Sequence, residues 1–182
     1  MNRGQLIRIF KCFTAALVLA GCTGGGAVLK VPDDTIAVCA GVLPGKVEPY
    51  WFGVSVSNAG QSPITLKAVH LGEQDHILMN DAFAVPAVRL ADGTMLGVGV
   101  MHNPAEESSD LWAGRQSVAG YVIAPGAHVD LALGLSRDGA ETGRVHSQIV
   151  TYRVDGERYD RNATSELNLA LTNDCETLDD VQ

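Results

Sequence analysis

Histidine and acidic side chains that could bind a metal ion gather in one short segment, HLGEQDHI. The four candidates are His70, Glu73, Asp75 and His76. Imidazole and carboxylate groups ligate transition metals, and the two histidines could approach each other across a turn. Their spacing matches no established metal motif, and metal affinity depends on geometry as well as on residue type. We therefore expect ordinary surface side chains here and assign no metal ligand.

Thioether and imidazole groups farther along the chain suggest copper as a related possibility. The residues concerned are Met79, Met95, Met101 and His102. Thioether sulfur suits Cu(I), and secreted copper chaperones of the β-sandwich type use clusters of Met and His. The repeated His-x-Met arrangement of that family is absent from this chain. Binding or delivery of a metal, with copper as the metal, is therefore the alternative function and not the leading one.

The longest segment without strand character spans residues 101–116. It contains Glu106, Glu107, Asp110, Trp112 and Arg115. Irregular segments of this length are often functional, and Trp and Arg are enriched at binding hot spots. One hypothesis is a partner-binding loop that uses Asp110, Trp112 and Arg115. The simpler interpretation, which we favour, is that Trp112 caps the end of a β-sandwich while the acidic side chains are solvated.

Sequence motifs of the common hydrolase and nucleotide-binding classes are absent. The chain has no Gly-x-Ser-x-Gly nucleophile elbow, no His-Glu-x-x-His pair and no phosphate-cradling glycine loop. Ser, His and Asp are present, but a catalytic triad is recognised by its geometry. A carboxylate pair for glycoside hydrolysis stays open as a third possibility. We predict that the protein is not an enzyme and that it uses no cofactor.

The first 21 residues have the organisation of a secretory signal, with a basic start followed by an apolar core over residues 13–20. A membrane-spanning helix needs about 20 apolar residues. The uncharged run from residue 12 to residue 28 is shorter than that and contains three consecutive glycines, which are poor helix formers. We therefore expect a cleaved signal and not a spanning segment.

The end of this signal, Leu19-Ala20-Gly21-Cys22, resembles the lipobox of bacterial lipoproteins. The resemblance covers residues 1–22. It implies that the Cys22 thiol receives a diacylglyceryl group and that cleavage makes Cys22 the mature N-terminus. Two or more acyl chains hold a protein stably at a bilayer, so the protein would be anchored in the bacterial cell envelope on the extracytoplasmic side. The alternative is a soluble secreted protein with an incidental cysteine.

Of the four cysteines, Cys12 would leave with the signal and Cys22 would carry the lipid, so Cys39 and Cys175 remain. In an oxidising compartment we expect these two to form a disulfide. Such a bond would close a loop of about 137 residues and stabilise the fold by up to about 5 kcal/mol. The alternatives are two free thiols or metal ligation, although no zinc-like spacing is present.

The charge of the chain becomes more acidic when the signal is removed. The first 21 residues carry three of the 13 basic residues and none of the 21 acidic ones, so the remaining 161 residues have a net charge of −11. That length suits one domain with a sizeable core. A strongly acidic protein is a poor partner for nucleic acid and for anionic lipid surfaces. The lipid would therefore supply the contact with the membrane.

Short strand signals follow one another along the rest of the chain. They cover residues 35–42, 50–58, 63–71, 83–101, 117–123, 128–136, 144–160 and 164–175. Residues 50–58, 128–136 and 164–175 alternate between apolar and small or polar side chains, the pattern of half-buried strands. Asp92-Gly93 and Asp155-Gly156 predict hairpin turns. Pro86 predicts an edge strand, and a slip of the apolar phase within 63–71 predicts a bulge.

Many short strands without crossover helices predict an all-β fold, an antiparallel sandwich. The segments VSVSNAGQSPITL and IAPGAHVDLALGL resemble the immunoglobulin-like sandwiches of bacterial surface proteins. We divide the chain into a signal (1–21), a lipidated flexible tether (22–33), the sandwich domain (34–175) and an acidic tail (176–182). The leading hypothesis is a non-enzymatic, lipid-anchored module that binds or supports an unknown protein or ligand of the cell envelope.

Overall fold

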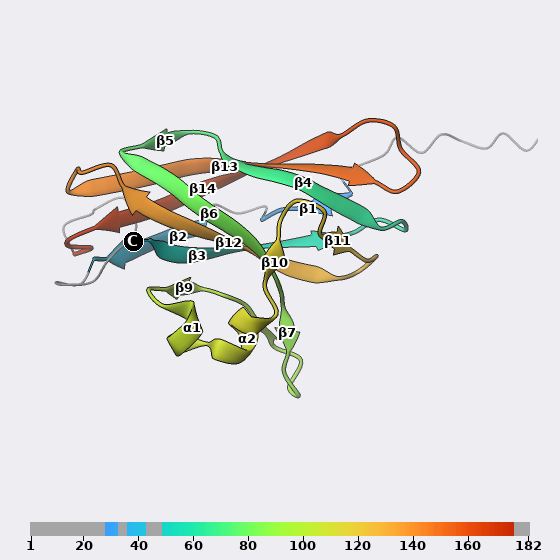
Figure 1. The fold of residues 1–182 in the computed structure, drawn as a ribbon, viewed down its shortest axis with the longest axis horizontal. Coiled ribbons are helices and arrows are strands. Elements are labelled where there is room, and N and C mark those ends of the chain that lie inside the picture. The colour runs from blue at the N-terminus through green and yellow to red at the C-terminus, as the bar shows by residue number, and fades with distance from the viewer. Residues whose placement is uncertain (1–27, 33–35, 43–48, 177–182) are drawn as a thin grey trace, which may run out of the picture.

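The computed structural model of the chain describes residues 28–32, 36–42 and 49–176. These residues form an all-β protein in which two six-stranded sheets pack face to face (Figure 1). Residues 1–21, the predicted signal, and Cys22, the predicted lipidation site, lie outside the described residues. No helix within the described residues is long and apolar enough to cross a membrane.

The first sheet, here called sheet A, has β12 at its centre. In spatial order its strands are β1 (Leu29–Lys30), β3 (Tyr50–Asn58), β12 (His128–Arg137), β6 (Ile77–Pro86) and β10 (Gln116–Ser117), and β9 (Val100–Met101) pairs with β3 beside this path. All the pairings in sheet A are antiparallel. Leu29 and Lys30 thus belong to the sheet, although they fall within the segment that we expected to be a tether.

The second sheet, sheet B, is built around a long hairpin. The turn of this hairpin is the predicted one at Asp155-Gly156. Its strands in spatial order are β11 (Val122–Ile123), β4 (Ile64–Leu71), β13 (Thr142–Val154), β14 (Arg161–Thr172) and β2 (Ile36–Gly41), and β5 (Gln74–Asp75) pairs with β13. The pairing of β2 with β14 is parallel, whereas the other pairings are antiparallel. The register of β4 against β13 shifts between Leu66 and Ala68, so the predicted bulge is present.

The main core lies between the two sheets and follows the predicted period of two. In β3 the side chains of Phe52, Val54 and Val56 are buried, and in β14 the leucines 167, 169 and 171 are buried in the same way. β-Branched and aromatic side chains fill such pleated, half-buried surfaces well. The alternation that the sequence predicts therefore assigns the inner faces of β3 and β14 correctly.

The disulfide between Cys39 and Cys175 is present in the fold, with a distance of 5.9 Å between the two Cα atoms. Cys39 lies in β2, which is the edge strand of sheet B, and Cys175 follows the end of β14. The bond therefore fastens an edge strand to the C-terminal end of its neighbour. The predicted pairing agrees with this arrangement.

Three expectations about strands differ from the structure. Residues 117–123 do not form one strand, because β10 pairs in sheet A while β11 pairs in sheet B. β6 is not an edge strand at residues 83 and 84, because it pairs there with β12 on one side and with β10 on the other. Pro86 itself lies beyond the pairing with β10 and faces only β12. β12 is buried on both faces and not only on one, because a second layer covers its outer side.

Candidate partner-binding surface

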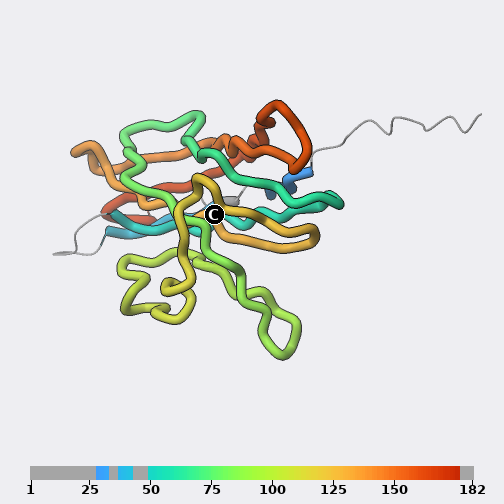
Figure 2. Tube along the Cα trace, turned by 45° about the vertical axis from the view of Figure 1, so that its right-hand side comes forward, coloured from blue at the N-terminus to red at the C-terminus, as the bar shows by residue number. Residues whose placement is uncertain are grey.

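A long excursion between β6 and β10, residues 87–115, folds over the outer face of sheet A and rejoins the sheet only where β9 pairs with β3. It contains β7 (Val88–Arg89), β8 (Met95–Leu96), β9, α1 (Pro104–Glu107) and α2 (Ser109–Ala113). Figures 1 and 2 show that the two short helices lie beside the sheet while the β7–β8 hairpin projects from the body of the molecule. The excursion, referred to below by that name, is the part of the fold that departs most from a simple sandwich.

Trp112 anchors the helical part of the excursion to sheet A. Its ring lies edge-on to Trp51 of β3, with centroids 4.8 Å apart, and edge-on to Phe83 of β6, with centroids 5.6 Å apart. Edge-to-face pairs at these separations are favourable beyond the apolar area that they bury. Only 9% of Trp112 is exposed, so its side chain anchors the excursion to the sheet.

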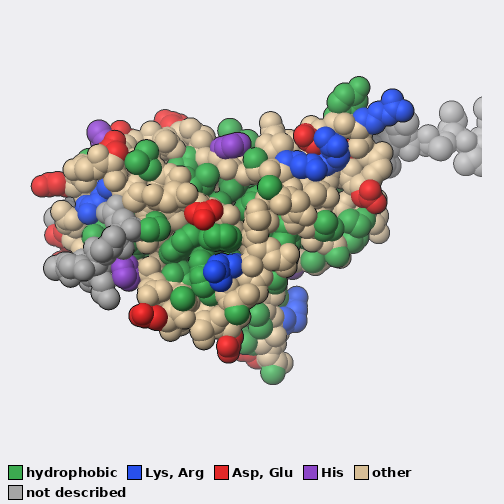
Figure 3. Space-filling model, viewed as in Figure 1, with side chains coloured by type: hydrophobic (Ala, Val, Ile, Leu, Met, Phe, Trp, Pro, Cys, Tyr) green, Lys and Arg blue, Asp and Glu red, His purple; other side chains and the backbone are tan. Residues whose placement is uncertain are grey.

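Arg115 closes this aromatic cluster from the solvent side. Its guanidinium carbon lies 5.0 Å from the ring centroid of Trp112 and 5.5 Å from that of Phe83. The same side chain donates a hydrogen bond from Nη1 to the backbone oxygen of Trp112. Cation–π contacts of this kind hold arginine over an aromatic surface. Figure 3 shows hydrophobic side chains gathered in the middle of this face, above α1 and α2.

A buried carboxylate holds the middle of the excursion against β12. Asp130 is only 5% exposed, and its Oδ2 accepts a hydrogen bond of 2.6 Å from the backbone N–H of Val98. Gly97 and Gly53 make this approach possible, because a Cβ at Gly97 would overlap the Asp130 carboxylate and one at Gly53 would lie 2.8 Å from Val98 Cβ. The backbone N–H of Gly53 also donates to the carbonyl of Gly99.

The projecting hairpin forms at the predicted turn, Asp92-Gly93. Asp92 Oδ1 accepts a hydrogen bond from the backbone N–H of Thr94. Hydrogen bonds from the backbone and side chain of Thr94 lower the pKa of Asp92 below its ordinary value. Gly93 has a φ of 90°, a conformation that glycine adopts without steric cost.

The hairpin carries an unusual share of the exposed apolar side chains. Eight large hydrophobic residues are exposed in the described parts of the chain, and five belong to the excursion: Val88, Leu90, Met95, Leu96 and Val100. Val88 and Leu96 are register partners in β7 and β8, and each is 44% exposed. Directly opposite residues of a strand pair project on the same face. Clustered exposed apolar side chains are typical of interaction sites.

A groove of about 470 Å³ separates this apolar face from the two helices. We call it the hairpin groove: Val88 and Leu96 form one side, and Glu106, Glu107, Ser108, Ser109, Asp110 and Leu111 form the other. Its volume lies within the range of small-ligand and side-chain pockets. The sequence analysis missed the hairpin side, because a short strand pair with apolar residues resembles any other core hairpin until its position outside the sandwich is known.

The acidic side of the groove is only partly used for structure. Glu107 Oε1 accepts hydrogen bonds from the backbone N–H groups of His102 and Asn103 and so stabilises the start of α1. Glu106 and Asp110 are exposed. Within the described residues none of these three carboxylates forms an ion pair. The groove therefore presents negative charge beside an apolar surface.

Asp110, Trp112 and Arg115, the residues of the predicted partner-binding loop, have different positions in the structure. Trp112 points into the aromatic cluster, and Arg115 covers that cluster. Of the three, Asp110 alone lines the hairpin groove. The favoured interpretation of Trp112 as a structural residue agrees with its burial, but its place differs from the expected one. It covers the outer face of sheet A, not an end of the sandwich, because the excursion folds back across β3 and β6.

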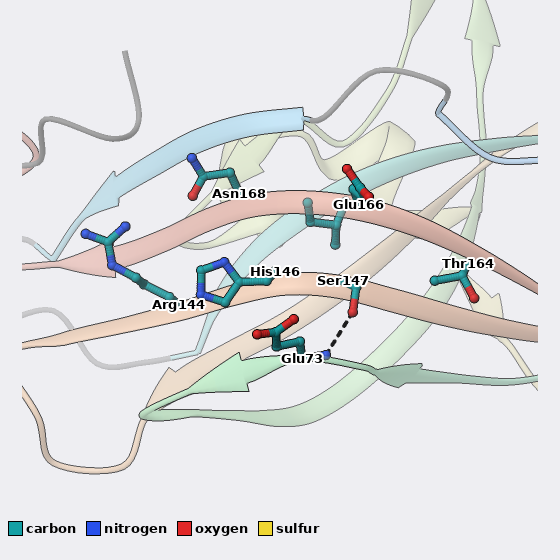
Figure 4. A pocket seen from close by; sticks show the side chains of 8 residues that line it. Glu73, Arg144, His146, Ser147, Thr164, Glu166 and Asn168 are labelled. Atoms are coloured by element: carbon teal, nitrogen blue, oxygen red, sulfur yellow. Dashed lines mark hydrogen bonds between the residues drawn. The ribbon is translucent and has the colours of Figure 1, made fainter.

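A second groove lies on the outer face of sheet B (Figure 4). Its volume is about 590 Å³, and its lining includes Glu73, Arg144, His146, Ser147 and Glu166. Ser147 Oγ accepts a hydrogen bond from the backbone N–H of Glu73, as the dashed line in Figure 4 shows. The Ser147 hydroxyl thus secures the turn before β5 to the bulge of β13.

The residues considered as metal ligands do not converge. His76 Nε2 lies 3.6 Å from Asp75 Oδ1, and His76 Nδ1 lies 3.3 Å from Asp138 Oδ1. Met101 packs instead against the cluster that contains Trp112, on the outer side of sheet A. His102 lies edge-on to the ring of Tyr50. Within the described residues no group of three or more His, Cys, Asp or Glu could hold a metal ion.

Comparison with known proteins identifies no family for this chain. No family model matches it, and no curated protein matches it. Among solved structures it is similar to a chain from the structure of the Vibrio cholerae VesB protease, with a TM-score of 0.34 and 12% identity over 78% of this chain. The match covers 31% of the other chain, so this protein spans about a third of its length. A likeness at this level carries no argument about function.

Proposed function

We propose that the protein is a lipid-anchored, extracytoplasmic binding module of the bacterial cell envelope, and that it contacts its partner through the hairpin groove. The observation that carries this proposal is the exposed pair Val88 and Leu96, held beside the acidic helices on a projecting hairpin. Large apolar side chains that lie together on an exposed face are typical of interaction sites.

The cellular location and the fold class in this proposal rest on the sequence together with the fold. The lipobox at Leu19–Cys22 supports lipid anchoring, and the Cys39–Cys175 disulfide is compatible with an oxidising compartment. The two packed sheets support an immunoglobulin-like sandwich. Metal delivery is the weaker candidate because its proposed ligands are dispersed.

Two experiments in the native host test the proposal. Cys22→Ser should move the protein out of the washed membrane fraction, and retention there would contradict lipid anchoring. A photo-crosslinking amino acid at Leu96 should give a discrete cross-linked product. The matched control is the same amino acid at Tyr159, which is 81% exposed in the turn between β13 and β14. Equal products from both positions, or none from Leu96, would contradict binding at the groove.

A further inference from the structure

We propose that the hairpin groove binds a segment of a partner protein in which apolar side chains are flanked by lysine or arginine. This inference rests on the proposed function and adds the chemistry of the partner. Its apolar part follows from the exposed, register-paired side chains of Val88 and Leu96, which face the groove beside Leu111. Apolar side chains of a partner would exclude water from this surface, and burial of apolar area is the main source of affinity in such contacts.

The cationic part of the inference follows from the charges around the groove. Among the described residues, the carboxylates Glu106, Glu107 and Asp110 line it, and no basic side chain does. The two arginines of the excursion are directed elsewhere. Arg89 donates to the carbonyl of Gly93 at the hairpin turn, and Arg115 lies over the aromatic cluster. Complementary charge steers a partner to its site and rejects partners of the same sign.

The same charges disfavour the two other occupants of an exposed apolar groove. A second copy of this chain would bring identical carboxylates to a symmetric contact, because a two-fold interface pairs a surface with itself. An anionic lipid bilayer would repel Glu106 and Asp110, since its surface potential attracts basic groups and not acidic ones. A protein segment with both apolar and basic side chains complements the apolar side of the groove and its acidic side.

Binding of model peptides tests this chemistry directly. The probes are 12-residue peptides with alternating Lys and Leu, with alternating Glu and Leu, and with alternating Lys and Ser. The full-length lipoprotein is held in phosphatidylcholine nanodiscs, with empty discs as the blank, and binding is followed by fluorescence anisotropy. We expect the Lys–Leu peptide to bind more tightly than the other two and its affinity to fall as salt is raised.

Two pairs of variants separate the groove from general electrostatics. Glu106→Gln with Asp110→Asn should weaken Lys–Leu binding by about fivefold, the effect of losing two exposed ion pairs. Glu73→Gln with Glu166→Gln removes two negative charges from the outer face of sheet B and should leave binding unchanged. Leu96→Ser should also weaken binding, whereas Tyr159→Ser should not. Circular dichroism of each variant checks that the fold is kept.

Several results would overturn the inference. The first is a Glu–Leu peptide that binds as tightly as the Lys–Leu peptide, and the second is a control pair, Glu73→Gln with Glu166→Gln, that loses as much binding as the groove pair. The others are concentration-dependent dimerisation that blocks the peptide and binding of phosphatidylglycerol vesicles through the groove. The cross-link from Leu96 distinguishes this inference from the proposed function. A captured partner whose cross-linked segment, sequenced by mass spectrometry, contains no Lys or Arg would refute the cationic chemistry and leave the groove as a binding site.

Discussion

The carboxylate of Asp130 in β12 accepts a hydrogen bond of 2.6 Å from the backbone N–H of Val98, a residue 32 positions earlier in the chain. This contact fastens the excursion to the outer face of sheet A. Val98 packs in the same cluster as Trp112 and follows the projecting hairpin in the chain, so the contact helps to orient the surface that we propose for partner binding. Its place explains why an aspartate is buried in a strand that otherwise faces apolar layers.

Replacing Asp130 with alanine should loosen the excursion, because the buried N–H of Val98 would lose its acceptor. An unsatisfied buried donor costs about 1–3 kcal/mol, and we expect a decrease of that size in the free energy of unfolding measured with urea. Asp130→Asn keeps an oxygen acceptor of similar shape and should cost less. Equal stability of the alanine variant and the unmodified protein would show that this hydrogen bond contributes nothing.

Gly97→Ala should destabilise the same region, since the new methyl group would overlap the carboxylate of Asp130. Overpacking of a close contact typically costs about 1–3 kcal/mol. Gly114→Ala is the matched control, because a Cβ there meets ordinary contacts of 3.5 Å and 3.7 Å. Thermal unfolding followed by circular dichroism measures both. A similar melting temperature for the two variants would contradict the proposed close packing of Gly97.

Removing the disulfide should destabilise the sandwich without changing its fold. Cys39→Ser combined with Cys175→Ser should lower the free energy of unfolding by about 2–5 kcal/mol, as is typical for a native disulfide. Denaturant unfolding measures this effect. Thiol labelling of residues 23–182, denatured and non-reduced, gives an independent check, because two reactive thiols per chain would mean that the bond is absent from the native molecule.

Gln148→Met should stabilise the protein. Gln148 is fully buried, and neither its Nε2 nor its Oε1 has a hydrogen-bond partner in the described parts of the chain. Burying unpaired polar atoms costs free energy, and an apolar side chain of similar length avoids that cost. We expect an increase of about 1–2 kcal/mol in the free energy of unfolding. A decrease would mean that the amide makes favourable interactions in the native protein.

The hairpin turn should depend on pH through Asp92. The pKa of Asp92 is lowered in the fold, chiefly by the hydrogen bond from the backbone of Thr94. The ionised carboxylate therefore stabilises the turn above its unfolded pKa, and this contribution is lost as the pH falls through the lowered folded value. The amide NMR signal of Thr94 should shift below a pH of 3.8 and not in Asp92→Asn. A midpoint above 3.8 would contradict the direction of the shift.

Much of the framework of this protein could be predicted from local patterns. Alternation of side chains assigned the inner faces of β3 and β14, and the dipeptides Asp92-Gly93 and Asp155-Gly156 marked both hairpin turns. These features depend on neighbours along the chain, because a strand has a period of two and a tight turn needs particular backbone angles. The remaining cysteines likewise indicated the Cys39–Cys175 pair, which the fold contains.

The candidate surface could not be predicted in the same way, because it depends on contacts between distant segments. The sequence by itself determined most of the long strands, the two Asp-Gly turns, the acidic balance and the resemblance to a lipobox. Only the tertiary structure decided that Trp112 is buried against Trp51, while Val88 and Leu96 remain exposed. The physical reason is that burial follows from which layer covers a residue, and the folding of the excursion across sheet A sets that layer.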